Sequence, residues 1–312
     1  MKIFLAFFRL IRWPNLVFII LTQALFEYCI YYRVFPVSVR YQNEQQQFFL
    51  LVAASVCIAA AGYIINDYFD LNIDQINKPK KVIVNAIISR RWVILWHLIL
   101  SLIGLLLTIL ALPFTLHWPL IIANFVSIFL LLFYSSSLKK KLLIGNVLIS
   151  LLTAWVIGII FLSKMNLGLM RGEGDEILHV RFFRFAILYG GFAFIISLIR
   201  EVIKDMEDME GDRKYGCRTM PIVWGLNASK VFVAVWLIVL ITALVILQIY
   251  VLQYGWWLSI VYCVLFIIVP LLWIFNKLFA ANASQDFHIL SSAIKIIMLT
   301  GILSMLFFLL YH

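Results

Sequence analysis

Nine long apolar segments constrain the fold of this chain more than any other feature of the sequence. Each is long enough to cross the hydrocarbon core of a membrane, which takes about 20 helical residues. They lie at about 13–35, 48–66, 92–112, 118–135, 144–163, 181–200, 230–251, 255–276 and 289–311. Because 64% of the residues are hydrophobic, against roughly 45–50% in soluble domains, the sequence predicts an all-α, polytopic integral membrane protein.

The polar connections are short. The longest are 33–47, 67–91, 164–180 and 201–229, and none is long enough to form a hydrophobic core of its own. We therefore expect a single transmembrane domain over residues 1–312.

The positions of Lys and Arg predict the orientation, because basic loops stay preferentially on the cytoplasmic side. With the N-terminus inside, most basic residues fall in inner segments, including the clusters at 78–81, 139–141 and 213–218. The loops 67–91 and 201–229 are then cytoplasmic and the C-terminus lies on the opposite side. This topology and anionic lipid headgroups account for the net charge of +10, so the charge indicates no nucleic-acid partner. No obligate protein partner is indicated either.

Two acidic clusters stand at the ends of apolar segments. The first, NDYFDLNID at 66–74, contains Asp67, Asp70 and Asp74, and the second, REVIKDMEDMEGD at 200–212, repeats the spacing with Asp205, Asp208 and Asp212. At about 100° per residue, offsets of 0, 3 and 7 fall on one face of a helix. The repeated spacing predicts an internal duplication, with two four-helix units and one additional helix.

Several interpretations of these clusters compete. Acidic residues favour helix N-termini and are disfavoured by the dipole at C-terminal ends, which argues against a merely solvated helix end. An EF-hand calcium loop needs alternate-residue ligands and a Gly at its sixth position, and neither cluster has them. A transporter's ion pathway stays open as an alternative, although its polar residues belong near mid-membrane. A non-catalytic scaffold has no need of twinned aspartates.

The twinned aspartates favour a magnesium site. Mg²⁺ takes oxygen ligands and is usually held by a few carboxylates together with substrate phosphates. Two opposed aspartate strips would therefore clamp a metal-bound diphosphate, with nearby basic side chains contacting its oxygens. The metal-ligand candidates are Asp67, Asp70, Asp74, Asp205, Asp208 and Asp212. The four cysteines and five histidines show no zinc-ligand spacing.

The two motifs together resemble the paired signatures of the UbiA-type intramembrane prenyltransferases. The matching residues are Asn66-Asp67-x-x-Asp70-x-x-x-Asp74 with Ile76-Asn77-x-Pro79, and Asp208-x-x-x-Asp212-x-x-x-Gly216-x-Arg218-Thr219. The resemblance implies Mg²⁺-dependent transfer of a prenyl group from an isoprenoid diphosphate to a lipophilic acceptor, a membrane lipid. It implies a catalytic role for Asp67, Asp70, Asp208 and Asp212. The expected substrate-binding residues are Asn15, Asn66, Lys81, Tyr134, Lys139, Lys140, Lys204, Arg213, Lys214 and Arg218.

The string R-E-x-x-K-D-x-E-D-x-E-G-D from Arg200 to Asp212 is most similar to one branch of that family. This branch comprises the digeranylgeranylglyceryl phosphate synthases, which implies geranylgeranyl diphosphate as donor and geranylgeranylglyceryl phosphate as acceptor. An aromatic acid of quinone biosynthesis is the alternative acceptor, since those relatives share both aspartate motifs.

Overall fold

The computed structural model describes residues 2–36, 43–77, 79, 82–165 and 173–311. Within this part of the chain, nine helical spans are long and apolar enough to cross a membrane, which confirms the predicted number. The described residues form no β-strand and only one isolated bridge, between Val84 and Ile88. The chain is an all-α integral membrane protein, as the apolar segments predict.

The order of the elements follows the nine segments, with several short helices between them. The N-terminal half contains α1 (Lys2–Leu10), α2 (Trp13–Leu25), the π-helical turn η1 (Phe26–Tyr31), α3 (Tyr32–Val34), α4 (Glu44–Asn77), α5 (Arg90–Ala111), α6 (Phe114–Ser136), η4 (Leu138–Lys140) and α7 (Ile144–Met165). The C-terminal half contains α8 (Glu173–Glu207), α9 (Met209–Lys214), α10 (Met220–Val223), α11 (Leu226–Leu252), α12 (Trp257–Cys263), η5 (Val264–Ile268), α13 (Val269–Ala280), α14 (Ser284–Leu303) and η6 (Ser304–Leu309).

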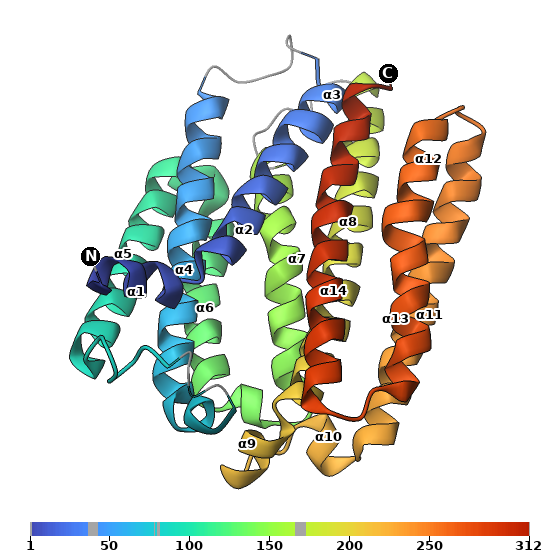
Figure 1. Ribbon diagram of the computed structural model, residues 1–312. Helices are drawn as coiled ribbons and strands as arrows, with labels where there is room; N and C mark the ends of the chain where they lie inside the picture. The colour runs from blue at the N-terminus through green and yellow to red at the C-terminus, as the bar shows by residue number, and fades with distance from the viewer. Residues whose placement is uncertain (1, 37–42, 78, 80–81, 166–172, 312) are drawn as a thin grey trace.

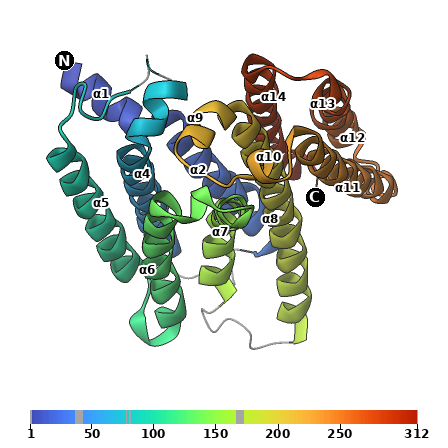
Figure 2. The same cartoon turned by 90° about the horizontal axis from the view of Figure 1, so that it is seen from below.

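The long helices run side by side in one bundle, and the short helices gather at its ends. Figures 1 and 2 show α9 and α10 at the end where α4, α7 and α8 begin or finish, whereas the C-terminus lies at the opposite end. Helix α1 lies across the direction of the long helices in both views. Its side chains Ile3, Phe4 and Leu5 are exposed, whereas Ala6 and Leu10 are buried against the bundle.

Two helices continue well beyond their apolar segments. Helix α4 extends to Asn77 and α8 extends to Glu207. A helix can continue on its backbone hydrogen bonds, and the polar side chains of these two extensions face a cavity. Both acidic clusters are therefore largely helical, as their spacing predicts. The second is interrupted at Asp208 (φ −95°, ψ 7°), and Asp212 belongs to the separate helix α9.

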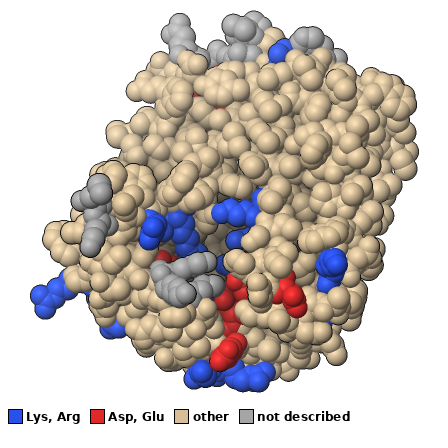
Figure 3. All heavy atoms as spheres, viewed as in Figure 1, with Lys and Arg blue, Asp and Glu red and all other residues tan. Residues whose placement is uncertain are grey.

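The bundle buries apolar side chains between helices and exposes apolar side chains to the outside. The largest buried cluster joins α8, α11, α13 and α14 through residues such as Ile199, Leu237, Leu271 and Ile294. Uncharged atoms cover most of the face in Figure 3, and many of the exposed residues are large hydrophobics. Such a surface suits a lipid environment and not water.

A buried ion cluster stands at the end of the bundle away from α9. Lys164, near the end of α7, donates to the Glu27 Oε1 atom of η1 at 2.6 Å and to the Glu44 Oε1 atom of α4 at 2.8 Å. The side chains are 5%, 0% and 4% exposed, respectively. The Lys164 Nζ atom also lies 4.5 Å from the centroid of the Tyr31 ring. This cluster joins three helical elements where each begins or ends.

Candidate active site

A cavity of about 360 Å³ lies among α2, α4, α6, α7, α8 and α14. Figure 3 shows a hollow on this face with Lys and Arg atoms inside it and acidic atoms beside it. Charged and amide side chains line the cavity together with apolar side chains, among them Phe18, Ile19, Leu131, Ile159 and Met298. The cavity can therefore accommodate a molecule with an anionic head and an apolar chain.

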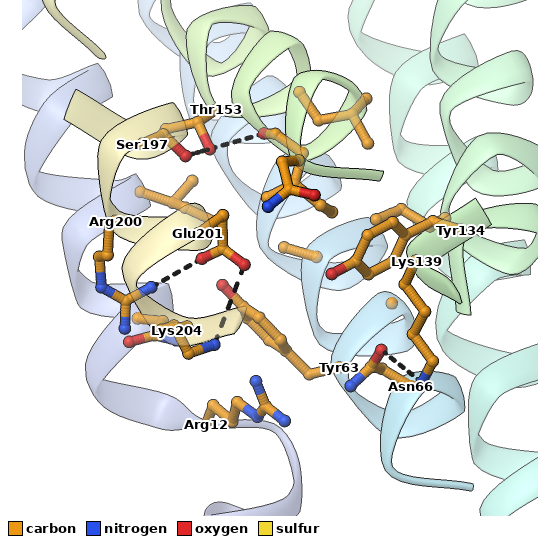
Figure 4. Close-up of a pocket in the computed structure, with 18 of the residues that line it drawn as sticks. Arg12, Tyr63, Asn66, Tyr134, Lys139, Thr153, Ser197, Arg200, Glu201 and Lys204 are labelled. Atoms are coloured by element: carbon orange, nitrogen blue, oxygen red, sulfur yellow. Dashed lines mark hydrogen bonds and ion pairs between the residues drawn. The ribbon is translucent and has the colours of Figure 1, made fainter. Parts of the chain in front are cut away.

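The first acidic strip forms one wall of the cavity. Asn66, Asp70 and Asp74 on α4 line it, and the Asn66 Nδ2 atom donates to Asp70 Oδ2 at 2.6 Å. Lys139, in the turn after α6, pairs with Asp70 and donates to Asn66 Oδ1 at 3.4 Å. Figure 4 shows Asn66, Lys139 and Tyr134 on the same side of the pocket.

Asp67 has a different neighbour from the rest of its strip. Its Oδ1 atom accepts a hydrogen bond from Arg12 Nη2 at 2.7 Å, and Asp67 is not among the residues that line the cavity. Burial lowers the pKa of Arg12, but Asp67, Tyr63 and Asp70 together raise it by more, so the net shift of the pKa is upward and the guanidinium stays charged. The ion pair anchors the start of α2 to α4, where Arg12 adopts a left-handed conformation with φ 51°.

The second acidic strip faces the same cavity from the other side. Asp205, Asp208 and Asp212 all line it, although the helix is interrupted between the first and the last of them. Asn146, on α7, donates from Nδ2 to Asp205 Oδ2 at 2.8 Å and fixes that carboxylate. The two strips predicted from the sequence thus come together around one space.

Asn77 clasps the ends of the two strips together. Its Nδ2 atom donates to the Asp208 carbonyl oxygen at 3.0 Å, and its Oδ1 atom accepts from the Gly211 backbone N–H at 2.9 Å. A Cβ atom on Gly211 would lie only 2.5 Å from Asn77 Oδ1. Glycine is therefore needed for this close approach between α4 and α9.

Polar groups in the remaining wall of the cavity are held by neighbouring helices. Trp155 Nε1 donates to Asn124 Oδ1 at 3.1 Å, and Asn124 Nδ2 donates to the Thr108 hydroxyl at 3.0 Å. The hydroxyls of Thr153 and Ser197 lie 3.2 Å apart, and Figure 4 shows them together at the top of the pocket. Most of these groups bond to protein, so this region offers few free donors to a ligand.

The structure brings most of the predicted site residues to the cavity. Those lining it are Asn15, Asn66, Asp70, Asp74, Tyr134, Lys139, Lys204, Asp205, Asp208 and Asp212. Asp67, Lys140, Arg213, Lys214 and Arg218 do not line it. Lys214 lies on the surface with its Nζ atom 3.5 Å from Glu210 Oε1, and the Lys140 carbonyl accepts from the Arg218 backbone N–H at 2.7 Å. Lys81 lies outside the described residues.

Sequence reasoning missed several cavity residues. Arg200 forms a 2.9 Å ion pair with Glu201, and Lys295 on α14 donates from Nζ to Asn15 Oδ1 at 2.7 Å. Lys295 has no motif around it, but a lysine inside a membrane-spanning segment is itself a sign of a functional site. Asn146 carried no such signal, because a lone Asn at the start of an apolar segment is common.

The donor set fits magnesium. Carboxylate and amide oxygens from α4, α8 and α9 face one space, and such hard oxygen ligands suit Mg²⁺. Among the described residues, no three Asp, Glu, His or Cys side chains converge closely enough to hold a cation by themselves. This arrangement suits a metal that completes its shell with water and substrate phosphate oxygens.

Comparison with known proteins identifies a family. Residues 35–299 match the model of the UbiA prenyltransferase family. The chain is 37% identical over 198 residues to digeranylgeranylglyceryl phosphate synthase of Methanothermobacter thermautotrophicus, which spans 62% of each chain. It is 30% identical to the synthase of the same name from Methanosphaera stadtmanae over 81% of this chain and 86% of that protein.

A solved structure extends the similarity to the fold. A UbiA homologue from Archaeoglobus fulgidus, bound to DMAPP and Mg²⁺, superposes with a TM-score of 0.57. The match covers 96% of this chain and 98% of that one at 15% sequence identity. At this identity the likeness concerns the arrangement of the helices.

Proposed function

The chain belongs to the UbiA prenyltransferase family, and on that premise we propose that it transfers a geranylgeranyl group from geranylgeranyl diphosphate to geranylgeranylglyceryl phosphate. The observation that carries the proposal is the meeting of the two acidic strips and Lys139 at one cavity. The similarity to synthases named for the digeranylgeranyl product supports the choice of acceptor.

The diphosphate of the donor would bind between the strips. Asn66, Asp70 and Asp74 on one side, with Asp208 and Asp212 on the other, would hold Mg²⁺. The metal, when bound, neutralises phosphate charge and stabilises the leaving diphosphate. Lys139 would contact the diphosphate oxygens directly, as a cation that Asp70 already positions. Asp205 would be a weaker ligand of Mg²⁺ than these residues, because one of its carboxylate oxygens accepts a hydrogen bond from Asn146.

The reaction replaces one carbon–oxygen bond with another. The bond between the allylic C1 atom and the diphosphate oxygen breaks, and the electron pair leaves with the diphosphate. The acceptor hydroxyl oxygen then bonds to C1 and its proton departs with the diphosphate, so that atoms and charges balance. Water must be kept from the electron-poor C1, and apolar side chains of the cavity lining, such as Ile19 and Ile159, would contact the prenyl chain.

We also propose that the end of the bundle bearing α9 and α10 faces the cytoplasm. The basic residues of the segments at this end support that orientation under the positive-inside rule. The N-terminus would then be cytoplasmic and the C-terminus on the opposite side. A single domain over residues 1–312 is consistent with the family match over residues 35–299.

The test is a transfer assay with the purified protein in lipid nanodiscs. With Mg²⁺ and both substrates we expect the diether product, and EDTA should stop its formation reversibly. Asp70→Asn and Asp208→Asn should each lower kcat by about 100-fold or more, since each removes charge stabilisation from the leaving group. The surface variant Lys277→Met is the matched control.

A competition between acceptors separates the two candidate substrates. Geranylgeranylglyceryl phosphate and 4-hydroxybenzoate are supplied together, and the products are read by mass spectrometry. Diether as the main product supports the proposal. Prenylated benzoate without diether would contradict the proposed acceptor but support the prenyltransferase activity. No prenylated product from either acceptor would refute the proposed function.

A further inference from the structure

A group of four cationic side chains lines the cavity on the side away from Lys139. Arg12 precedes α2, Arg200 and Lys204 lie on α8, and Lys295 lies on α14. Figure 4 shows Arg12, Arg200 and Lys204 on one side of the pocket, opposite Lys139 and Asn66. Three segments that are far apart in sequence thus bring positive charge to one wall, which we call the cationic wall.

The four cations of this wall differ in the carboxylates that they contact. Arg12 pairs with Asp67 at 2.7 Å, and Glu201 serves both Arg200 at 2.9 Å and Lys204 at 3.9 Å. Lys295 forms no ion pair with any described carboxylate. The charges of Arg200, Lys204 and Arg12 also repel Lys295.

Lys295 is the least compensated of the four. It lies well inside the membrane-spanning helix α14, where its Nζ atom donates to Asn15 Oδ1 at 2.7 Å and stands 5.4 Å from the Phe18 ring centroid. An amide oxygen and a ring face offer only partial compensation for a charge in a membrane segment. The buried Nε atom of Arg200 also has no hydrogen-bond partner within the described part of the chain. Both features indicate an anionic ligand at this wall.

We propose that Arg200, Lys204 and Lys295 bind the phosphate of the acceptor, and that they make the site select a lipid phosphomonoester over neutral or carboxylate acceptors. The inference rests on the proposed function and deepens it. A phosphomonoester carries about −1.5 to −2 charges near pH 7, which suits a wall that bears several cationic side chains. Asn15 is a positioning residue, because it holds the Lys295 ammonium toward the cavity.

The division of cations between the two phosphate groups follows from their positions. The donor diphosphate would lie between the two acidic strips, with Lys139 and the metal-ligand candidates around it. The cationic wall is then left for the second anion, and the acceptor hydroxyl enters the space between the two. Placing unlike substrates in separate subsites orients the acceptor oxygen toward C1, which is a large part of catalysis in two-substrate reactions.

The experiment measures acceptor and donor constants separately for wild type, Lys295→Met, Lys295→Arg and Arg200→Gln in nanodiscs. The acceptors are geranylgeranylglyceryl phosphate and the corresponding diol without phosphate. Losing one charged contact should raise the KM of the phosphorylated acceptor by about tenfold or more. The KM of geranylgeranyl diphosphate should stay within about twofold, and the wild-type preference for the phosphorylated acceptor should shrink. Lys295→Arg should restore most of that preference, and Lys277→Met is the control for loss of a lysine.

Other results would overturn the assignment. An unchanged acceptor KM in Lys295→Met, or an equal rise in the KM of the diphosphate, would remove the cationic wall from acceptor binding. Equal use of both acceptors by wild type would refute the subsite and leave prenyl transfer intact. Equilibrium binding of radiolabelled geranylgeranylglyceryl phosphate to wild type and Lys295→Met decides the matter even without turnover: equal affinities contradict the proposal.

Discussion

Gly211 shows at the scale of one residue how the site is held together. Its backbone N–H bonds to Asn77, and a Cβ atom would lie 2.5 Å from the Asn77 amide oxygen. Gly211→Ala should therefore push α9 away from α4 and displace Asp212 from the cavity. Because misplacing reactive groups is costly, we expect kcat/KM to fall by about ten- to a hundredfold.

The chain provides a matched control for this substitution. Gly190, on α8, has no atom within 4 Å of the position of an added Cβ, so Gly190→Ala should change kcat/KM by less than about twofold. Steady-state assays of both variants in nanodiscs, with thermal unfolding to verify the fold, provide the measurement. Equal activity of the two variants would show that the clasp has no role in catalysis.

Cys217 supports a pH-dependent prediction at the same scale. Burial, followed by the nearby Asp212 charge, raises the pKa of this thiol to about 11. The thiol is 5% exposed, and it stays neutral at pH 7, whereas only the thiolate reacts rapidly. Maleimide labelling of Cys217 should thus be slow at pH 7 and accelerate about tenfold per pH unit between pH 8 and 10. Peptide mass spectrometry reads the rate, and a rate that levels off below pH 9 contradicts the raised pKa.

At the scale of helices, the sequence predicts the presence of the membrane-spanning helices better than the residues at which they end. The nine apolar runs mark nine spans because hydropathy reports directly on lipid burial. Hydropathy does not predict that α4 continues beyond Ile65 or that α8 continues beyond Ile199. Both helices continue with polar side chains, because these side chains face a cavity. The helical spacing of the aspartates predicts part of these polar extensions. It could not locate the interruption at Asp208.

Some of the candidate site residues can be predicted from the sequence, and others are found only in the structure. Repeated spacing predicted Asp70, Asp208 and Asp212, which line the cavity, since a motif can be read from the sequence alone. Lys295 and Asn146 reach the cavity from other helices and carry no motif, so only the packing of α14 and α7 reveals them. Conversely, Arg213 and Lys214 stand next to the motif in sequence but do not line the cavity.

The buried cluster of Lys164, Glu27 and Glu44 supports an element-scale prediction. It joins the end of α7 to η1 and the start of α4, at the end of the bundle away from the aspartates. Lys164→Met removes the Lys164 ammonium from two buried carboxylates, so we expect the free energy of unfolding to fall by about 3 kcal/mol. Denaturant titration in detergent provides the measurement.

The same variant should leave substrate binding unaltered. The cluster does not line the cavity, so the KM of either substrate should change by less than about twofold at temperatures where the protein is folded. Lys277→Met, which removes an exposed lysine, should alter neither stability nor KM. A stable Lys164→Met protein would show that the cluster contributes nothing to folding.

At the scale of the whole molecule, the orientation can be tested with two introduced cysteines. Glu210 lies on α9 with its side chain 80% exposed, and Tyr254 lies between α11 and α12 with 55% exposure. In intact cells, a membrane-impermeant maleimide should label Tyr254→Cys and spare Glu210→Cys until the membrane is permeabilised. The opposite pattern would invert the proposed topology. Native Cys217 is a poor reporter because it is buried.

Helix α1 has a consequence for how such a protein would meet its substrates. It lies across the bundle with exposed apolar side chains, as helices do that rest in the membrane interface, and it leads through Arg12 directly to the cavity wall. The phosphates would then enter the cavity from the depth where lipid headgroups already lie. Substrates and product would stay in a two-dimensional solvent throughout. Their effective concentration would be a mole fraction of the bilayer, and adding inert lipid would slow the reaction at constant molarity.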